Sequence, residues 1–312
     1  MRLITYCSKS EHASNLDHVG ALTSDGERIV DLTPDFGSLL ALIDRGDEGL
    51  ALARKRVAEA KETVALADVG LRAPLPEPRQ IRDFMTFELH YRQAIAAATR
   101  MRVGPLAPLA RVLGIAQLPR VWYEQPIYYK CNRFSVVGPE ADVIWPRGAE
   151  LMDYECELAA VIGKTGKDIP RERALEHIFG FTIYNDMTAR DLQLREMQAR
   201  LGPAKGKDFD SGNVFGPWIV TRDEIDPYDL TMIARVNGEE RGRGYSRDMH
   251  HRWEDIIAHV SRNETLHAGE ILGSGTVGNG CGLEHRRFLE PGSVVELEIT
   301  GIGKLRNRLV KL

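Results

Sequence analysis

Two glutamates lie two residues apart in an otherwise apolar stretch of the chain. Glu155 and Glu157 belong to LMDYECELAAVIGK, which reads as a β-strand. In a strand, residues i and i+2 project from the same face, so both carboxylates point the same way. At about 4 Å and an effective dielectric constant of about 20, their repulsion costs roughly 4 kcal/mol, which a divalent cation would relieve. The alternative is a solvent-facing edge with two ordinary glutamates.

A second polar group follows the next apolar run, in FTIYNDMTARDLQ. Asp186 ends the run, and Arg190 and Gln193 follow at i+4 and i+7, which places all three on one side of a helical turn. The alternative is that Asp186 only caps a helix. Further on, Lys205 and Lys207 lie in a Gly-flanked loop, where a lysine usually serves only solubility.

Two more segments carry residues suited to chemistry. The stretch IRDFMTFELH contains Asp83, Glu88 and His90, and the alternative for this histidine is a partly buried ring bonded to the backbone. The stretch GEILGSGTVGNGCGLEH is a strand followed by a glycine-dense loop. There, backbone N–H groups and the Thr276 hydroxyl can approach a ligand closely.

The secondary structure predicted from the sequence changes near residue 73. Before it, Asp25-Gly26 predicts a hairpin, and the apolar spacing from Leu39 to about Leu66 predicts an amphipathic helix. Prolines at alternate positions from 74 to 78 then exclude a continuing helix or central strand. We therefore place a domain boundary at residue 73.

The remainder, residues 74–312, is mostly short apolar runs separated by glycine-rich turns. Asn237-Gly238 and Gly301-Ile302-Gly303 predict hairpins, and helical patterns are short. The pattern favours a β-sandwich, roll or barrel over a doubly wound parallel sheet. The Ala/Arg/Leu-rich stretch from Tyr91 to Val121 departs from it, so we expect a mobile insertion or lid around residues 84–121.

The charge composition excludes some classes of binding partner. The 312 residues carry 41 Lys plus Arg against 45 Asp plus Glu, so no basic field exists for nucleic acid or an anionic membrane. The four cysteines form no C-x-x-C pair, and we find neither a signal peptide nor a membrane-spanning run. We expect a cytoplasmic protein with a small-molecule partner.

Taken together, five ordered segments resemble the fumarylacetoacetate hydrolase family. They are R-D-F-x-x-F-E-x-H at 82–90, D-Y-E-x-E-L-A-x-V-I-G at 153–163, N-D-x-T-A-R-D-x-Q at 185–193, G-K-x-F-D at 206–210 with G-P-W at 216–218, and G-S-G-T-V-G at 273–278. Each is weak alone, but the ordered set is specific. The resemblance implies a mixed α/β, β-rich protein: a small N-terminal α+β domain (1–73) and a family-type β-sandwich or roll (74–312).

The resemblance also implies a role for each site residue. Glu155, Glu157 and Asp186 match the metal ligands, and Asp83 matches a further acidic ligand. An all-oxygen set suits Mg²⁺ or Mn²⁺, with Ca²⁺ as the runner-up. The position of the water-activating base is taken by His90. Its acidic partner is expected to be Glu284, with Glu88 less favoured. The residues that match polar or pocket-lining groups around the substrate are Arg190, Gln193, Lys207, Thr276 and Tyr128.

The reaction expected from the resemblance is metal-dependent hydrolysis of a C–C bond in a 1,3-dicarbonyl acid, such as an acylpyruvate or a fumarylacetoacetate-like compound. His90, held by Glu284, would activate water, and Lys207 would stabilise developing negative charge. The alternatives are decarboxylation, isomerisation, hydration or dehydration of a 2-oxo acid at the same site. From a different class, the chain would be a non-catalytic β-domain that binds a divalent ion. Relatives are usually homodimers, which sets the same expectation here.

Overall fold

The computed structural model describes residues 1–9, 16–112 and 117–312, and its strands form two main sheets. The larger has the order β4 (Val64–Ala65), β3 (Arg28–Asp31), β2 (His18–Leu22), β1 (Arg2–Ser8), β14 (Asn213–Thr221), β12 (Ile178–Asp186), β11 (Cys156–Ile162), β17 (Ile271–Gly273), β6 (Ile81–Phe84) and β7 (Tyr128–Cys131). Off this path, β5 (Val69–Leu71) pairs with β1, and β8 (Val136–Val137) pairs with β14.

The smaller sheet has the order β16 (Glu239–Tyr245), β15 (Thr231–Val236), β18 (Val294–Ile299), β19 (Gly303–Val310) and β9 (Asp142–Ile144). A separate pair joins β10 (Met152–Asp153) and β13 (Thr188–Ala189). The fold is thus mixed α/β and rich in sheet, which confirms the predicted class. The hairpins predicted at residues 25–26, 237–238 and 301–303 are also confirmed.

The helices are mostly short. They are α1 (Thr33–Phe36), α2 (Leu39–Asp44), α3 (Gly46–Glu59), α4 (Glu88–Val103), α5 (Ala107–Val112), α6 (Arg120–Glu124), α7 (Arg190–Glu196), α8 (Ala204–Lys207), α9 (Trp253–Ser261) and α10 (Gly282–His285), with a 3₁₀ helix at Arg171–His177. The single helix predicted from Leu39 to about Leu66 is wrong in extent. It breaks at Gly46, whose φ is 53°, and residues beyond Glu59 turn into β4, which pairs with β3.

Strand β11 shows why the sheet is buried on both faces. Leu158, Ala160 and Ile162 belong to the core between the two main sheets, whereas Ala159 and Val161 belong to a second core on the opposite face. Apolar side chains therefore alternate between two interiors, as the period of a strand requires. Glu157 shares its face with Ala159 and Val161, so its carboxylate enters the protein.

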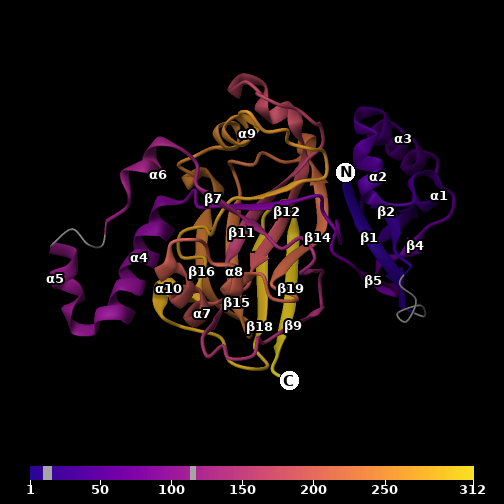
Figure 1. The fold of residues 1–312 in the computed structure, drawn as a ribbon. Coiled ribbons are helices and arrows are strands. Elements are labelled where there is room, and N and C mark those ends of the chain that lie inside the picture. Colours follow the sequence, from indigo (N-terminus) through magenta and orange to yellow (C-terminus); the bar gives the residue numbers. More distant parts are fainter. Residues whose placement is uncertain (10–15, 113–116) are drawn as a thin grey trace.

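The first 73 residues join the rest through the sheet. Strand β1 pairs antiparallel with β14, with Leu3 opposite Ile219, and both residues belong to one apolar cluster with Ala159 and Phe179. Figure 1 shows these N-terminal elements on one side of the main body and helices α4, α5 and α6 on the other. The domain boundary at residue 73 stays a prediction.

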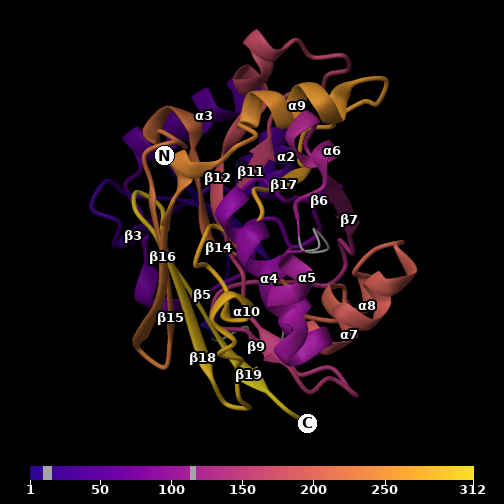
Figure 2. The ribbon, with the colours of Figure 1, turned by 90° about the vertical axis from the view of Figure 1, so that its left-hand side faces the viewer.

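Residues 85–112 and 117–124 form an arm that includes α4, α5 and α6. In Figures 1 and 2, α4 and α5 leave the sheet edge as an extended pair, and α6 returns towards α9. The arm is fixed to the body at both of its ends. At its start, His250 N–H donates to the Thr86 carbonyl at 2.9 Å, and at its end His251 Nε2 lies 2.6 Å from the Trp122 carbonyl oxygen. The predicted lid thus corresponds to a helical arm, except that residues 113–116 lie outside the described range.

Candidate metal and active site

Three carboxylates from neighbouring strands meet at one point. Asp83 lies on β6, Glu157 on β11 and Asp186 at the end of β12, and one oxygen from each falls within 4.8 Å of the others. Gly273, on the intervening strand β17, makes this convergence sterically allowed. A Cβ atom at this position would lie 2.8 Å from Asp83 Oδ1 and 3.0 Å from Glu157 Oε2. The glycine therefore leaves space that a side chain would fill.

The electrostatics of this triad fit a bound cation. Burial raises the pKa of all three carboxyl groups, and for Glu157 the charges of Asp83 and Asp186 raise it further. Oδ1 of Asp83 and Oδ1 of Asp186 are buried and have no hydrogen-bond partner among the described residues. Buried carboxylates that repel one another and leave oxygens unsatisfied are what a divalent ion would compensate. All three donors are hard oxygens, which suits Mg²⁺, Mn²⁺ or Ca²⁺.

Glu155 lies beside the triad and forms ion pairs with two basic side chains. Its Oε1 is 2.6 Å from Arg190 Nη2, and its Oε2 is 2.6 Å from Lys207 Nζ. Burial opposes ionisation of Glu155, but Arg190 and Lys207 outweigh it and hold the pKa below its ordinary value. Because Lys207 occupies one of its oxygens, the role of Glu155 as a metal ligand stays a prediction.

Lys207 is a buried bridge between two acidic residues. Its side chain is only 5% exposed, and the ammonium contacts both Glu155 and Asp186. Burial would lower the pKa of this lysine, but Asp186 and Glu155 raise it above the ordinary value, so the group stays charged. The alternative of a solubilising surface lysine is therefore wrong for Lys207. Short helix α8 carries it into the interior, while Lys205 on the same helix stays exposed.

The predicted partnership of His90 and Glu284 has hydrogen-bond geometry. His90 is buried at the start of α4, and its Nδ1 lies 3.0 Å from Glu284 Oε1. The same carboxylate accepts hydrogen bonds from the backbone N–H groups of Asn279 and Cys281, each at 3.0 Å. Glu88, the less favoured candidate, bonds instead to Arg92 and Tyr123. An electrostatic interaction with His90 is among the causes that lower the pKa of Glu155, so the imidazole lies within electrostatic reach of that carboxylate.

Arg190 and Gln193 sit together, but Asp186 is not on their helix. Arg190 Nη1 donates to Gln193 Oε1 at 3.1 Å within α7, whereas Asp186 is the last residue of β12. The predicted helical turn containing all three is therefore wrong, as is the N-cap alternative. β13 separates the two elements, and Lys207 and Glu155 connect Asp186 with Arg190 across space.

The glycine-rich loop wraps around Glu157. Gly275 N–H donates to Glu157 Oε2 at 2.9 Å, and the Thr276 hydroxyl lies 3.4 Å from Glu157 Oε1. Gly275 has a φ of 81°, and a Cβ atom there would lie 2.3 Å from the Phe84 carbonyl oxygen. The loop thus needs glycine to bring its backbone against this carboxylate.

Two residues that contact the site, Tyr129 and Asp153, were not among the candidates selected from the sequence. Tyr129, the neighbour of the selected Tyr128, donates from its hydroxyl to Asp186 Oδ2 at 3.0 Å. The selected Tyr128 instead packs on Phe84 with ring centroids 4.9 Å apart, because neighbours on a strand face opposite ways. Asp153 accepts from Arg190 Nε at 2.7 Å, and its place two residues before Glu155 was an available signal.

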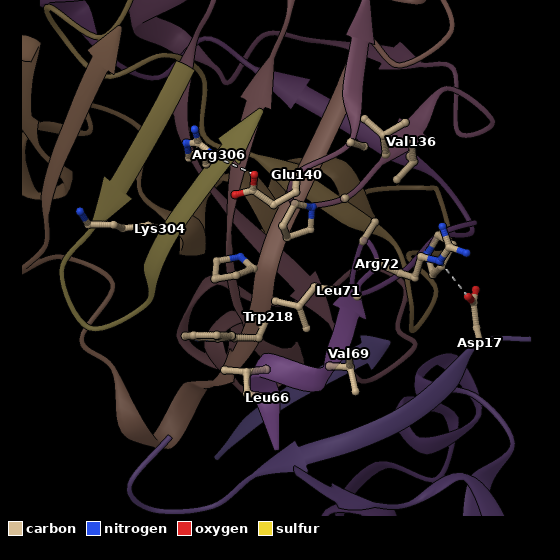
Figure 3. Close-up of a pocket in the computed structure, with 18 of the residues that line it drawn as sticks. Asp17, Leu66, Val69, Leu71, Arg72, Val136, Glu140, Trp218, Lys304 and Arg306 are labelled. Atoms are coloured by element: carbon tan, nitrogen blue, oxygen red, sulfur yellow. Dashed lines mark hydrogen bonds and ion pairs between the residues drawn. The ribbon is translucent and has the colours of Figure 1, made fainter. Parts of the chain in front are cut away.

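A separate cavity of about 910 Å³ is lined by residues of the N-terminal segment, of the stretch 136–141, of β14 and of β19. Figure 3 shows Trp218 and Leu71 on its wall, with Arg306 paired to Glu140 and Arg72 paired to Asp17 at its edge. Its lining includes neither the carboxylates of the triad nor Glu155, Lys207, Arg190, His90 or Glu284. The cavity is therefore distinct from the carboxylate triad.

Comparison with known proteins agrees with the geometry of the site. The family model for the C-terminal domain of fumarylacetoacetate hydrolase matches residues 103–310. This chain belongs to the fumarylacetoacetate hydrolase family. Across the ranges that the structure describes, no helix has the length and apolar character needed to cross a membrane.

Family members with different reactions resemble the chain over nearly its whole length. The oxaloacetate tautomerase YisK of Bacillus subtilis is 33% identical over 296 residues, covering 91% of this chain and 90% of that protein. A fumarylacetoacetate hydrolase from Exiguobacterium antarcticum is 30% identical with a TM-score of 0.75, covering 100% of both chains. A probable 2-hydroxyhepta-2,4-diene-1,7-dioate isomerase from Mycobacterium abscessus is 28% identical with a TM-score of 0.75, covering 100% of this chain and 99% of that one.

Proposed function

We propose that this protein is a divalent-metal-dependent enzyme that moves a proton next to the carbonyl group of a small 2-oxo acid, and that its reaction is keto–enol tautomerisation of an oxaloacetate-like dicarboxylate. The observation that carries the proposal is the buried triad of Asp83, Glu157 and Asp186 together with the hydrogen-bonded pair of His90 and Glu284, whose side chains are also buried. The resemblance to the B. subtilis tautomerase over nine-tenths of both chains supports this reaction.

The metal would be held by Asp83, Glu157 and Asp186, with Glu155 as a further ligand. When bound, such an ion acts as a Lewis acid that makes the proton next to the 2-oxo group easier to remove. Mg²⁺ and Mn²⁺ fit the all-oxygen donor set best, and Ca²⁺ is the next choice.

His90 would transfer the proton. A carboxylate can only accept a hydrogen bond, so Glu284 fixes the proton of His90 on Nδ1 and leaves Nε2 free to act as the base. The charge of Glu284 then stabilises the imidazolium that forms. Returning the proton to the substrate oxygen rather than to carbon completes the tautomerisation.

The basic residues would orient the substrate. Lys207 and Arg190 are buried and charged, and both contact Glu155 at the edge of the triad. Their positive charges offset the acidic cluster and favour an anionic substrate. Thr276 and Gln193 add neutral polar groups near the same place.

Hydrolysis of a C–C bond in an acylpyruvate is the second candidate. It uses the same residues, with His90 taking its proton from water instead of carbon, and Lys207 stabilising charge on the leaving fragment. The similarity to the E. antarcticum fumarylacetoacetate hydrolase favours it. Decarboxylation, hydration and dehydration would need the same activated carbon.

One experiment separates these reactions. The purified protein with Mg²⁺ or Mn²⁺ is mixed with enol-oxaloacetate and, separately, with acetylpyruvate and fumarylpyruvate. Loss of enol absorbance gives the rate, and NMR identifies the products. Tautomerisation yields keto-oxaloacetate with all its carbon atoms retained, whereas hydrolysis yields pyruvate and a second acid. If neither compound class reacts faster with protein than without it, the proposal is wrong.

A further inference from the structure

A buried thiol stands next to the base. Cys281 is fully buried, and its Sγ lies 3.9 Å from His90 Nδ1, which in turn lies 3.0 Å from Glu284 Oε1. One atom each from His90, Cys281 and Glu284 falls within a 4.8 Å cluster, separate from the carboxylate triad. The reaction proposed above uses the histidine and the glutamate but gives the thiol no part.

The spacing of these donors matches a tetrahedral site. With bonds of about 2.0 Å to nitrogen and oxygen and about 2.3 Å to sulfur, ligand atoms around Zn²⁺ lie roughly 3.3 to 3.6 Å apart. The observed separations of 3.0 and 3.9 Å lie within a few tenths of an ångström of this range. Small side-chain rotations would therefore accommodate an ion without moving the backbone.

The donor types select a different metal from the triad. Nitrogen and sulfur ligands suit Zn²⁺, whereas a set of oxygens suits Mg²⁺ or Mn²⁺. We propose that His90, Cys281 and Glu284 form a second metal site for a borderline ion such as Zn²⁺, and that its occupation removes His90 from the reaction. A water molecule would complete the four ligands.

Binding at this site exchanges protons for the ion. The thiol proton of Cys281 leaves to solvent, the His90 proton moves from Nδ1 to Nε2 so that the coordinating ring stays neutral, and Glu284 coordinates through Oε1 in place of accepting from His90. Oε2 of Glu284 keeps the hydrogen bond from the Cys281 N–H group. With the imidazole coordinated and its bond to Glu284 replaced, the pair no longer acts as a base.

The site also joins the arm to the body. His90 lies on α4 of the arm, whereas Cys281 immediately precedes α10 and Glu284 lies within it. Apolar contacts already link these parts, because Ala97 of α4 packs in one cluster with Cys281 and Leu283. An ion bound across them would hold α4 against α10, so Zn²⁺ would both block the base and fix the arm.

Cobalt provides a test that does not depend on activity. Co²⁺ is titrated into protein saturated with Mg²⁺, and the near-ultraviolet band that thiolate ligation gives to Co²⁺ is recorded. We expect the band in the wild type, its disappearance in Cys281→Ser and in His90→Ala, and its displacement by Zn²⁺. Glu157→Gln and Cys156→Ser should retain it, since the first changes only the triad and the second removes another buried thiol. No band in the wild type, or a band that persists in Cys281→Ser, would overturn the proposal.

Inhibition is the second measurement, and it rests on the proposed function. With Mg²⁺ in excess, Zn²⁺ should inhibit enol turnover. Each protein's rate is compared with its own rate without Zn²⁺, and half-inhibition of Cys281→Ser should need at least about tenfold more Zn²⁺ than half-inhibition of the wild type. Equal inhibition of the wild type and Cys281→Ser would contradict the role of the thiol. Because the cobalt band needs no substrate, it separates failure of this site from failure of the proposed reaction.

Discussion

At the scale of single residues, the proposed reaction assigns proton transfer to His90 and metal binding to the carboxylates. The two groups share no direct contact that the structure records, so they should separate on mutation. His90→Ala should lower kcat by about 10²- to 10⁴-fold, the usual contribution of a general base, and should leave Mn²⁺ affinity unchanged. His285→Ala, at an exposed histidine, is the matched control and should keep both properties. Wild-type turnover in His90→Ala would remove it from the role of base.

The raised pKa values of the triad predict how the metal-free protein responds to pH. The folded state keeps protons on Asp83, Glu157 and Asp186 that the unfolded chain has already lost, so unfolding releases protons and stability falls as pH rises. The fall begins near the ordinary values of 3.8 for Asp and 4.5 for Glu and continues as the pH rises towards the raised values. Glu155, whose pKa is lowered, loses its contribution only below this window.

Thermal unfolding with a chelator should therefore give a lower Tm at about pH 8 than at about pH 5. Added Mn²⁺ should raise Tm most at the higher pH, where the carboxylates are ionised and ready to bind. If the protein with chelator present is equally stable at both pH values and does not respond to Mn²⁺, then the carboxylates of the triad do not repel one another.

Most of the residues selected from the sequence lie close together in the structure, but their contacts were not predictable. The i and i+2 spacing of Glu155 and Glu157 predicted that both point the same way but not that this side is buried, which depends on how the sheet packs. The burial of Lys207 was not predictable locally, since a lysine in a Gly-rich loop looks exposed and only the tertiary fold brings Glu155 and Asp186 to it. Tyr129 was not distinguished from Tyr128 because the register of β7 on β6 decides which ring faces Asp83.

At the scale of elements, the arm is positioned by a short clasp, which we define as Met249, His250 and His251. Met249 forms a β-bridge with Phe87, and Trp122 stacks on His250 with centroids 4.8 Å apart while Trp122 Nε1 donates to the Met85 carbonyl at 2.6 Å. The clasp therefore holds both ends of the arm and sets the start of α4, where His90 lies.

His251→Ala should loosen this arrangement. It removes the 2.6 Å contact with the Trp122 carbonyl, so hydrogen exchange in α4 should become faster, and kcat/KM should fall by about tenfold through misplacement of His90. His267→Ala, at an exposed histidine, is the control. Unchanged exchange in α4 together with unchanged kinetics would show that the clasp does not position the base.

Secondary-structure elements were predicted correctly where a few neighbouring residues determine them. Hairpins with Asn-Gly or Asp-Gly turns were predictable because the turn geometry itself demands those residues. The helix expected through Leu66 was not, because β4 pairs with β3 and this long-range pairing overrides the apolar spacing. The apolar run predicted to end at Asp186 is β12, which pairs with β11 and β14 through that residue, so the helical turn expected to include Asp186 begins only at Arg190.

At the scale of the whole molecule, assembly stays a prediction. The arm carries exposed apolar side chains, including Leu106, Leu109 and Val112, at 63%, 55% and 82% exposure. Such residues favour coverage by another surface. Light scattering coupled to gel filtration should give twice the chain mass of 34.9 kDa if the protein is the expected homodimer. A single chain mass at all concentrations would contradict that expectation.

The central claim is that carboxylates from three strands hold one divalent ion on which the reaction depends. Mn²⁺ titration followed by electron paramagnetic resonance tests it most directly, because bound Mn²⁺ loses its free-ion signal. We predict one tight site per chain in the wild type, and at least about 100-fold weaker binding in Glu157→Gln, accompanied by loss of enol turnover. If Glu157→Gln binds Mn²⁺ as tightly as the wild type, the triad is not the metal site and the account fails.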